Sequence, residues 1–175
     1  MDQRIYLIGY MGVGKSTIAR KLAKLLNWEV MDLDQAFETR YKISVSDFFK
    51  RYDETLFRKL ERSLLRESVD LSQTIISTGG GTACFYDNME WMNQNGLTVF
   101  LKMSAGCLSN RLLNAKKKRP LISGQSKDQL QSFIKKHLQK RAIFYTQARL
   151  HFEAESPDIQ ALAELIKPYL SSAKI

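Results

Sequence analysis

The sequence predicts an α/β fold in which helices cover both faces of a parallel β-sheet. Two observations lead to this prediction. Short runs of apolar residues alternate along the chain with longer segments whose apolar residues recur at helical spacing. The 175 residues also show no internal repeat, no low-complexity tract and no linker rich in Pro, Gly or Ser. We therefore expect a single domain over residues 1–175.

Five short runs are expected to form the strands. Each is rich in apolar or aromatic residues, which fit the pleated surface of a sheet. Helical segments separate the runs, so consecutive strands should be joined by right-handed crossovers and run parallel. In such sheets, ligands bind beyond the carboxyl ends of the strands. The runs are 4–9, 28–34, 74–78, 97–103 and 149–154.

Helical periodicity predicts the elements that join these strands. Ile18, Leu22 and Leu25, for example, share one face of the first helix. The last helix is expected to open with Ser156 as its N-cap and Pro157 at its first position. The helices predicted before it are 16–26, 44–52, 54–69 and 127–145.

The net charge of +9, from 27 Lys and Arg against 18 Asp and Glu, points to an anionic partner. Nucleic acid is not expected, because the basic runs 114–121 and 135–141 have no interleaved aromatic residues to stack on bases. No apolar run approaches the roughly 18 residues of a membrane-spanning helix, so no membrane contact is expected. Cys84 and Cys107 form neither a disulfide framework nor a metal-binding spacing, which predicts free thiols in a reducing cytoplasm.

A glycine-rich loop between the first strand and the first helix carries the clearest motif. Gly9, Gly14, Lys15 and Ser16 have the spacing G-x-x-x-x-G-K-[ST] of a P-loop. Loop amides and the positive end of the helix would bind a polyphosphate, with Lys15 on the outer phosphates and Ser16 on Mg²⁺. A tight turn that matches by chance is the alternative. No Asn/Thr-Lys-x-Asp segment is present to read guanine, so ATP is expected. The nucleotide-binding residues would be Gly12, Val13, Gly14, Lys15, Ser16 and Thr17.

Two acids follow the second predicted strand. Asp32 and Asp34 are two residues apart, which places both on one side of that strand. Carboxylates so placed repel each other unless a cation or a substrate donor uses them. One division is Asp32 toward a metal and Asp34 toward an acceptor hydroxyl. The alternative is Asp34 as the N-cap of a helix over 35–40 beside a solvated Asp32.

For three arginines, the sequence allows a purely structural role as well as a functional one. Arg58 could form an i,i+3 surface pair with Glu61 and need no function. Arg141 could equally be a solvated residue on a helix flank. Arg119 lies in an irregular stretch between two helices, which is typical of a mobile flap or of a charged solubilising loop.

Taken together, the motifs resemble those of the shikimate kinases. They occur in that family's order over residues 9 to about 148: GYMGVGKST, DLD, FRKLE, STGGG, RPL and KRAIFY. The resemblance implies a three-layer α/β/α P-loop kinase fold with a five-stranded parallel sheet. It also implies a substrate-binding helical region at about 33–61 and a lid at about 112–126. The implied reaction is transfer of the ATP γ-phosphate to the 3-hydroxyl of shikimate, in chorismate and aromatic amino-acid biosynthesis.

The same resemblance implies a role for each matching residue. Lys15 and Arg119 would stabilise the phosphoryl group in transit, and Arg119 would thereby also bind the nucleotide. Ser16 and Asp32 would hold Mg²⁺, Asp32 directly or through water. Asp34 would bind the acceptor hydroxyl and either accept its proton or only position it. The residues implied to bind shikimate are Asp34, Arg58, Gly79, Gly80, Gly81 and Arg141.

The three consecutive glycines would let the backbone approach the substrate without side chains in the way, although a flexible turn is the alternative. A bulky residue at Gly80 is then expected to raise the KM for shikimate far more than the KM for ATP. The resemblance favours a monomer. Other candidates are a gluconate kinase, a nucleic-acid-associated P-loop module, and a nucleotide-dependent interaction module without enzymatic activity.

Overall fold

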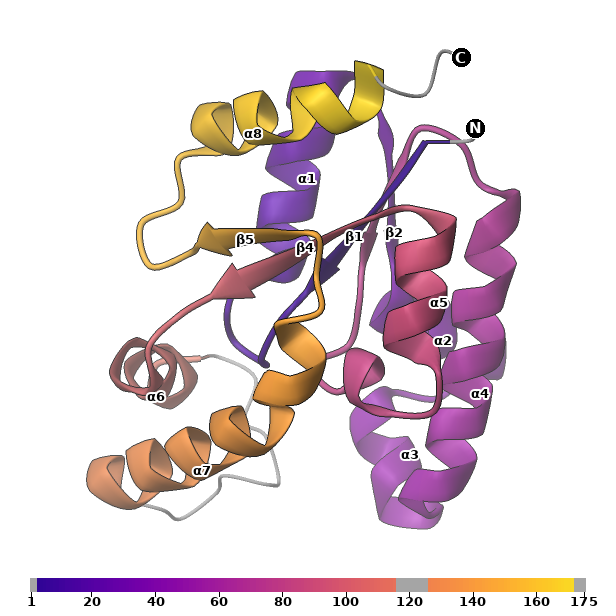
Figure 1. Ribbon diagram of the computed structural model, residues 1–175. Helices are drawn as coiled ribbons and strands as arrows, with labels where there is room; N and C mark the ends of the chain where they lie inside the picture. The colour runs from indigo at the N-terminus through magenta and orange to yellow at the C-terminus, as the bar shows by residue number, and fades with distance from the viewer. Residues whose placement is uncertain (1–2, 116–125, 172–175) are drawn as a thin grey trace.

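The computed structural model describes residues 3–115 and 126–171, except for the side chain of Ser171. Its centre is one five-stranded sheet in the order β2-β3-β1-β4-β5, and all four strand pairs are parallel (Figure 1). The predicted five-stranded parallel sheet is therefore confirmed. The strands are β1 (Arg4–Ile8), β2 (Glu29–Asp32), β3 (Thr74–Ser77), β4 (Leu97–Lys102) and β5 (Leu150–Glu153).

Helices cover both faces of this sheet. They are α1 (Lys15–Leu26), α2 (Leu33–Tyr41), α3 (Val45–Arg51), α4 (Glu54–Glu67), α5 (Asn88–Asn95), α6 (Ala105–Leu113), α7 (Lys127–Tyr145) and α8 (Ile159–Ser171). Two short 3₁₀ turns complete the described elements, η1 (Ser68–Asp70) and η2 (Thr82–Cys84). In the part of the chain that the structure describes, no helix has the length and apolar character needed to cross a membrane.

The pleat of β1 divides the interior into two cores, because successive side chains of a strand point to opposite faces. Ile5 and Leu7 pack with the buried side chains of α1, α6, α7 and α8. Tyr6 and Ile8 pack on the other face with those of α2, α3, α4 and α5. Figure 1 shows α1 and α8 on one side of the sheet and α4 and α5 on the other. These layers confirm the predicted three-layer α/β/α fold.

The second predicted strand is shorter than expected. The strand β2 ends at Asp32, and the carboxylate of this residue accepts a hydrogen bond from the amide of Gln35 at 3.2 Å. Asp32 is thus the N-cap of α2, and Asp34 lies in the first turn of that helix. Both the placement of the two acids on one strand and the alternative of Asp34 as the cap are wrong.

The start of the last helix was also predicted wrongly. The helix α8 begins at Ile159 rather than at Pro157. The carboxylate of Asp158 accepts hydrogen bonds from the amides of Gln160 at 2.9 Å and Ala161 at 3.2 Å. Asp158, not Ser156, therefore satisfies the free amides of the first turn.

The strand order determines where a ligand can bind. The strand that follows β1 in the sequence, β2, is not its neighbour in the sheet. The chain then returns, and β3 lies between β1 and β2. The loops after β1 and β3 therefore leave neighbouring strands at the same edge of the sheet. A crevice at such a reversal is the usual ligand site of open parallel sheets.

Candidate active site

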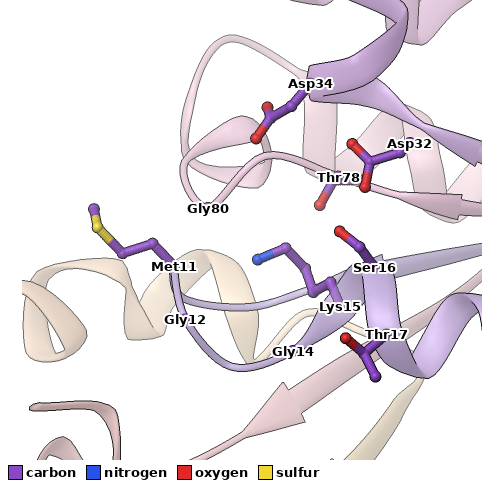
Figure 2. Close-up of a pocket in the computed structure, with 10 residues that line it drawn as sticks. All are labelled: Met11, Gly12, Gly14, Lys15, Ser16, Thr17, Asp32, Asp34, Thr78 and Gly80. Carbon is purple, nitrogen blue, oxygen red and sulfur yellow. The ribbon is translucent and has the colours of Figure 1, made fainter. Parts of the chain in front are cut away.

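A cavity of about 190 Å³ lies at this edge, between the loops that follow β1 and β3 and the start of α2 (Figure 2). It joins the P-loop, both acids of the DLD motif and part of the glycine run. Residues that are distant in the sequence thus meet in one place, as the prediction required. The lining residues are Met11, Gly12, Gly14, Lys15, Ser16, Thr17, Asp32, Asp34, Thr78 and Gly80.

The P-loop wraps around the side chain of Lys15. Gly12 and Gly14 have φ values of 83° and 103°, the left-handed region that favours glycine. The ammonium of Lys15 donates hydrogen bonds to the carbonyls of Gly9 at 2.7 Å and Tyr10 at 3.1 Å. Lys15 is only 7% exposed, and its ammonium lies in the space between the loop and Gly80 (Figure 2). A cation is therefore fixed at the floor of the cavity.

The helix α1 starts at the cavity without a capping side chain. Its N-cap is Gly14, which offers no side-chain acceptor, and its first turn contains no acidic residue. By contrast, α2, α3, α4, α6 and α7 each begin with a side chain that accepts a bond from a first-turn amide. The start of α1 is thus a place for an anion, because helix N-termini carry unsatisfied amides and a partial positive charge. The site fits the phosphates of ATP.

Oxygen atoms suited to Mg²⁺ lie beside this helix start. The hydroxyls of Ser16 and Ser77 are 3.2 Å apart, and the carboxylate of Asp32 lies on the same side of the cavity (Figure 2). Among residues 3–115 and 126–171, no group of three or more His, Cys, Asp or Glu could hold a metal by itself. A hydroxyl and a carboxylate suit Mg²⁺, which takes oxygen ligands and usually completes its shell with phosphate and water.

The three glycines are needed because other parts of the protein come so close to them. None of the three has a positive φ. Instead, a Cβ at each position would clash with a neighbouring segment. From Gly79 it would lie 2.6 Å from Glu61 Oε1, from Gly80 2.8 Å from the Met11 amide nitrogen, and from Gly81 2.7 Å from Arg58 Nη2. The glycine run is therefore in contact with the P-loop on one side and with α4 on the other.

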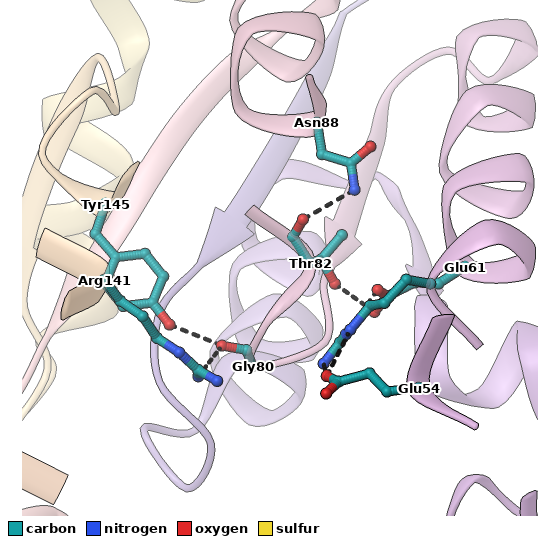
Figure 3. A network of polar contacts seen from close by, with 8 residues as sticks. Glu54, Glu61, Gly80, Thr82, Asn88, Arg141 and Tyr145 are labelled. Carbon is teal, nitrogen blue, oxygen red and sulfur yellow. Dashed lines mark hydrogen bonds and ion pairs between the residues drawn. The ribbon is translucent and has the colours of Figure 1, made fainter. Parts of the chain in front are cut away.

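Arg58 reaches the glycine run from a buried ion pair. Its Nη1 lies 2.8 Å from Glu61 Oε2, and its Nη2 lies 2.9 Å from Glu54 Oε1 (Figure 3). The side chains of Arg58 and Glu61 are 11% and 3% exposed. The i,i+3 pair considered from the sequence exists, but its placement on the surface is wrong. The guanidinium also stacks on Phe85, at 4.2 Å from the ring centre.

The Glu61 carboxylate continues this network away from the cavity. Its Oε1 accepts a 2.6 Å hydrogen bond from the hydroxyl of Thr82. The side-chain amide of Asn88, at the start of α5, donates to the Thr82 carbonyl at 2.9 Å (Figure 3). These bonds tie the end of the glycine run to α4 and α5.

Arg141 holds the glycine run from the opposite side. Its Nη1 donates to the carbonyl of Gly80 at 3.0 Å, and the hydroxyl of Tyr145 donates to the same oxygen at 2.7 Å (Figure 3). The guanidinium of Arg141 also lies over the ring of Tyr10, 5.3 Å from its centre. The two predicted carboxylate-binding arginines therefore flank the glycine run, one from α4 and one from α7.

Comparison with known proteins agrees with this geometry. The family model described as shikimate kinase matches residues 11–170. A shikimate kinase of Parabacteroides distasonis is 46% identical over 153 residues, which cover 87% of this chain and 88% of the relative. The chain belongs to the shikimate kinase family.

Solved structures of shikimate kinases have the same fold. The crystal structure of the enzyme from Bacteroides thetaiotaomicron has a TM-score of 0.89 and 42% identity, and the match covers 98% of this chain and 99% of that one. The enzyme from Acinetobacter baumannii, solved in complex with shikimate, has a TM-score of 0.83 and 29% identity, covering 100% and 96%. The predicted family is therefore confirmed along nearly the whole chain.

One predicted site residue of this shikimate kinase family member falls outside the described residues. Arg119 lies in 116–125, as does most of the lid expected at 112–126. Val13, another predicted nucleotide-binding residue, is buried in the core, and its carbonyl accepts a 3.0 Å bond from Arg111 Nη1. Arg111 comes from α6 and also donates to the carbonyl of Glu155 at 3.0 Å.

Several residues of the site were not found from the sequence. Ser77 is the last residue of β3 and Thr78 follows it directly, so the rule that ligands bind at the carboxyl ends of strands could have identified them. Arg111 and Thr82 carry no comparable signal, because their importance comes from contacts between distant segments. Glu61 and Tyr145 lie in the FRKLE and KRAIFY motifs, but the sequence does not show their bonds to Thr82 and Gly80.

Proposed function

We propose that this chain transfers the γ-phosphate of ATP to the 3-hydroxyl of shikimate, a step in chorismate and aromatic amino-acid biosynthesis. One observation supports this above all. In a chain that the shikimate kinase model matches over residues 11–170, the P-loop and the glycine run converge on one cavity. The predicted activity, enzyme class and use of ATP with Mg²⁺ follow from family membership.

The P-loop side of the cavity would hold the nucleotide. Amides at the start of α1 donate to the phosphates, and Lys15 places its positive charge beside the group in transfer. Ser16 and Asp32 would hold Mg²⁺. When bound, the ion neutralises the negative charge of the phosphates. For this role, the ammonium of Lys15 would leave the carbonyls of Gly9 and Tyr10, to which it donates here, and turn toward the phosphates.

The other side of the cavity would hold the acceptor. Asp34, in the first turn of α2, points toward Gly80 across the cavity (Figure 2). Its carboxylate is also close to Gly79, since a Cβ there would be 3.2 Å from Asp34 Oδ1. Asp34 would orient the acceptor hydroxyl and receive its proton. Arg58 and Arg141 would bind the substrate carboxylate, since the guanidinium plane can present two parallel donors.

The remaining assignments are proposals of the same kind. Arg119 would neutralise the transferred group from a lid over about 112–126, and residues 33–61 would form the acceptor-binding region. We further propose that the chain works as a cytoplasmic monomer without a nucleic-acid partner.

A direct assay tests the proposed function. ADP release is measured with shikimate, with gluconate, with single-stranded DNA and without an acceptor. We expect strong stimulation by shikimate alone, and a phosphorus NMR spectrum of the product should show a phosphate ester on the 3-hydroxyl. Equal stimulation by gluconate, or ADP release that needs no acceptor, would reject the proposal.

A further inference from the structure

The glycine run has little conformational preference of its own. Glycine has no side chain to limit φ and ψ, so three in succession lose more freedom on folding than any other tripeptide. Turn bonds hold two of its carbonyls, since Gly79 accepts from the amide of Thr82 at 3.3 Å and Gly81 from that of Cys84 at 2.8 Å. The carbonyl between them, that of Gly80, is held by side chains. Among the described residues, the side chains of Arg141 and Tyr145, from the last two turns of α7, both donate to the carbonyl oxygen of Gly80.

These two donors differ in what else they do. Arg141 is also proposed to bind the substrate carboxylate, so its bond to the Gly80 carbonyl competes with a second task. For Tyr145 no role in substrate binding is proposed. Its side chain is 1% exposed, and its ring stacks on Phe100 with centres 4.9 Å apart and planes at 21°. The hydroxyl is therefore fixed in direction by the packing of the ring.

The protonation state of Tyr145 suits this purpose. Burial raises the pKa of its hydroxyl well above the ordinary value. The group thus stays an O–H donor throughout the working pH range. Because the Gly80 carbonyl and the Gly81 amide belong to one planar peptide, fixing the oxygen also fixes the direction of that N–H.

We propose that Tyr145 is a positioning residue, whose hydroxyl holds the Gly80 carbonyl so that the glycine run keeps the orientation in which the acceptor substrate meets it. The inference rests on the proposed function, since it assigns the acceptor to this run. Tyr145 itself touches neither the substrate nor the reacting atoms.

The test is Tyr145→Phe, which removes the hydroxyl and leaves the ring. We expect the KM for shikimate to rise about tenfold. This is the change in affinity expected when a part-buried carbonyl loses one of its hydrogen-bond donors. The KM for ATP should change less than about threefold, because Lys15 and the P-loop are untouched. Amide hydrogen exchange of residues 79–82 should become faster.

The matched control is Tyr6→Phe. Tyr6 is also fully buried, and its hydroxyl bonds to the hydroxyl of Ser68 at 3.0 Å, away from the cavity. In both variants the group that loses the tyrosine hydroxyl keeps one other hydrogen bond. The Gly80 carbonyl keeps the bond from Arg141, and the Ser68 hydroxyl keeps its 2.6 Å bond to the Leu65 carbonyl. Tyr6→Phe should lower stability to a similar extent and leave both KM values unchanged.

The outcomes separate the two proposals. Wild-type protein that fails to phosphorylate shikimate would overturn the proposed function and this inference with it. An active wild type with the same shikimate KM in Tyr145→Phe and Tyr6→Phe would overturn this inference alone. If Tyr145→Phe did not fold, Phe100→Leu would replace it. That variant loosens the ring but keeps the hydroxyl, and an unchanged ratio of the two KM values would likewise reject the role.

Discussion

Arg58 binds two glutamates in different surroundings. Glu54 is 56% exposed, whereas Glu61 is 3% exposed and also accepts the hydroxyl of Thr82. An ion pair in water contributes little to stability, while a charge buried without its partner is costly. The two acids on one arginine thus provide a comparison within the same helix.

Replacing Glu61 should destabilise the protein far more than replacing Glu54. In Glu61→Gln the buried guanidinium of Arg58 loses its buried counter-ion and keeps only the exposed Glu54, so we expect the free energy of unfolding to fall by about 2–4 kcal/mol. Glu54→Gln should cost less than about 0.5 kcal/mol. Urea unfolding measures both. Similar losses in the two variants would show that burial does not strengthen the inner pair.

The same network changes what is expected of Arg58. A surface arginine could be removed with little effect on melting, but Arg58→Ala would leave Glu61 buried with one fewer partner. Loss of activity in that variant would therefore not distinguish substrate binding from instability. Activity has to be compared with Glu61→Gln, which has a similar structural cost and retains the arginine.

Asp34→Asn separates nucleotide binding from transfer. Asparagine has nearly the same shape but cannot accept the proton of a hydroxyl. We expect kcat to fall about 100-fold or more, the usual contribution of a general base, with little change in the dissociation constant for ATP. Steady-state kinetics and ATP titration measure the two quantities. A wild-type kcat would remove Asp34 from the proposed chemistry.

The glycine run and the P-loop touch, which alters the prediction for Gly80. A Cβ there would lie 2.8 Å from the Met11 amide nitrogen, so Gly80→Ala would displace the P-loop backbone. We now expect the KM for ATP and the KM for shikimate both to rise, each by about tenfold. A rise in the shikimate KM alone would favour the expectation from the sequence, in which substitution of Gly80 affects shikimate binding far more than ATP binding.

Gly106→Ala is the control for that substitution. Gly106 lies in α6, and the nearest atom to an added Cβ is Gln131 Nε2 at 3.6 Å, an ordinary contact. Alanine should therefore leave both KM values unchanged and raise stability by up to about 1 kcal/mol through its higher helix propensity.

Helix boundaries were predictable only where a single local signal was present. The predicted bounds of α7, 127–145, are those observed, because Ser126 and Gln129 form a capping box at its start. At α8, Ser156 and Pro157 match the usual start of a helix, but it is the next residue, Asp158, that accepts from the first-turn amides. At α2, both aspartates were predicted at the end of a strand. The sequence alone does not show which of the two carboxylates accepts from the first-turn amides of the helix.

The candidate site was predictable to the extent that its residues belong to contiguous motifs. The P-loop residues and the glycine run were found because a spacing or a run is visible along the chain. The bonds from Thr82 to Glu61 and from Tyr145 to Gly80 join residues 21 and 65 positions apart. Such pairings depend on how β3, α4 and α7 pack, and no periodicity encodes them.

At the scale of the whole molecule, stability should depend on the protonation of His137. Burial, together with the charges of Arg141 and Lys140, lowers the pKa of this side chain below its ordinary 6.5. Between that folded-state pKa and 6.5, the unfolded chain binds more protons than the folded one. Stability should therefore rise with pH across this window and fall as the pH is lowered through it.

Thermal melting between pH 5 and 8 measures this dependence, with His137→Gln as the comparison. The variant should lose part of the slope just below pH 6.5 and keep the further decrease in acid. That decrease comes from carboxylates such as Asp47 and Glu67, whose hydrogen bonds to Lys50 and Arg40 lower their pKa values. An unchanged slope below pH 6.5 would exclude His137 as its source.

The lack of a capping side chain at the N-terminus of α1 affects how melting curves should be measured. At α2, α3, α4, α6, α7 and α8 a side chain accepts from a first-turn amide, whereas α1 has no such side chain and offers its amides to an anion from the buffer. Binding to the native form alone shifts the transition by mass action. A curve recorded in phosphate buffer therefore reports occupancy as well as folding, and variants are best ranked in a medium free of oxyanions.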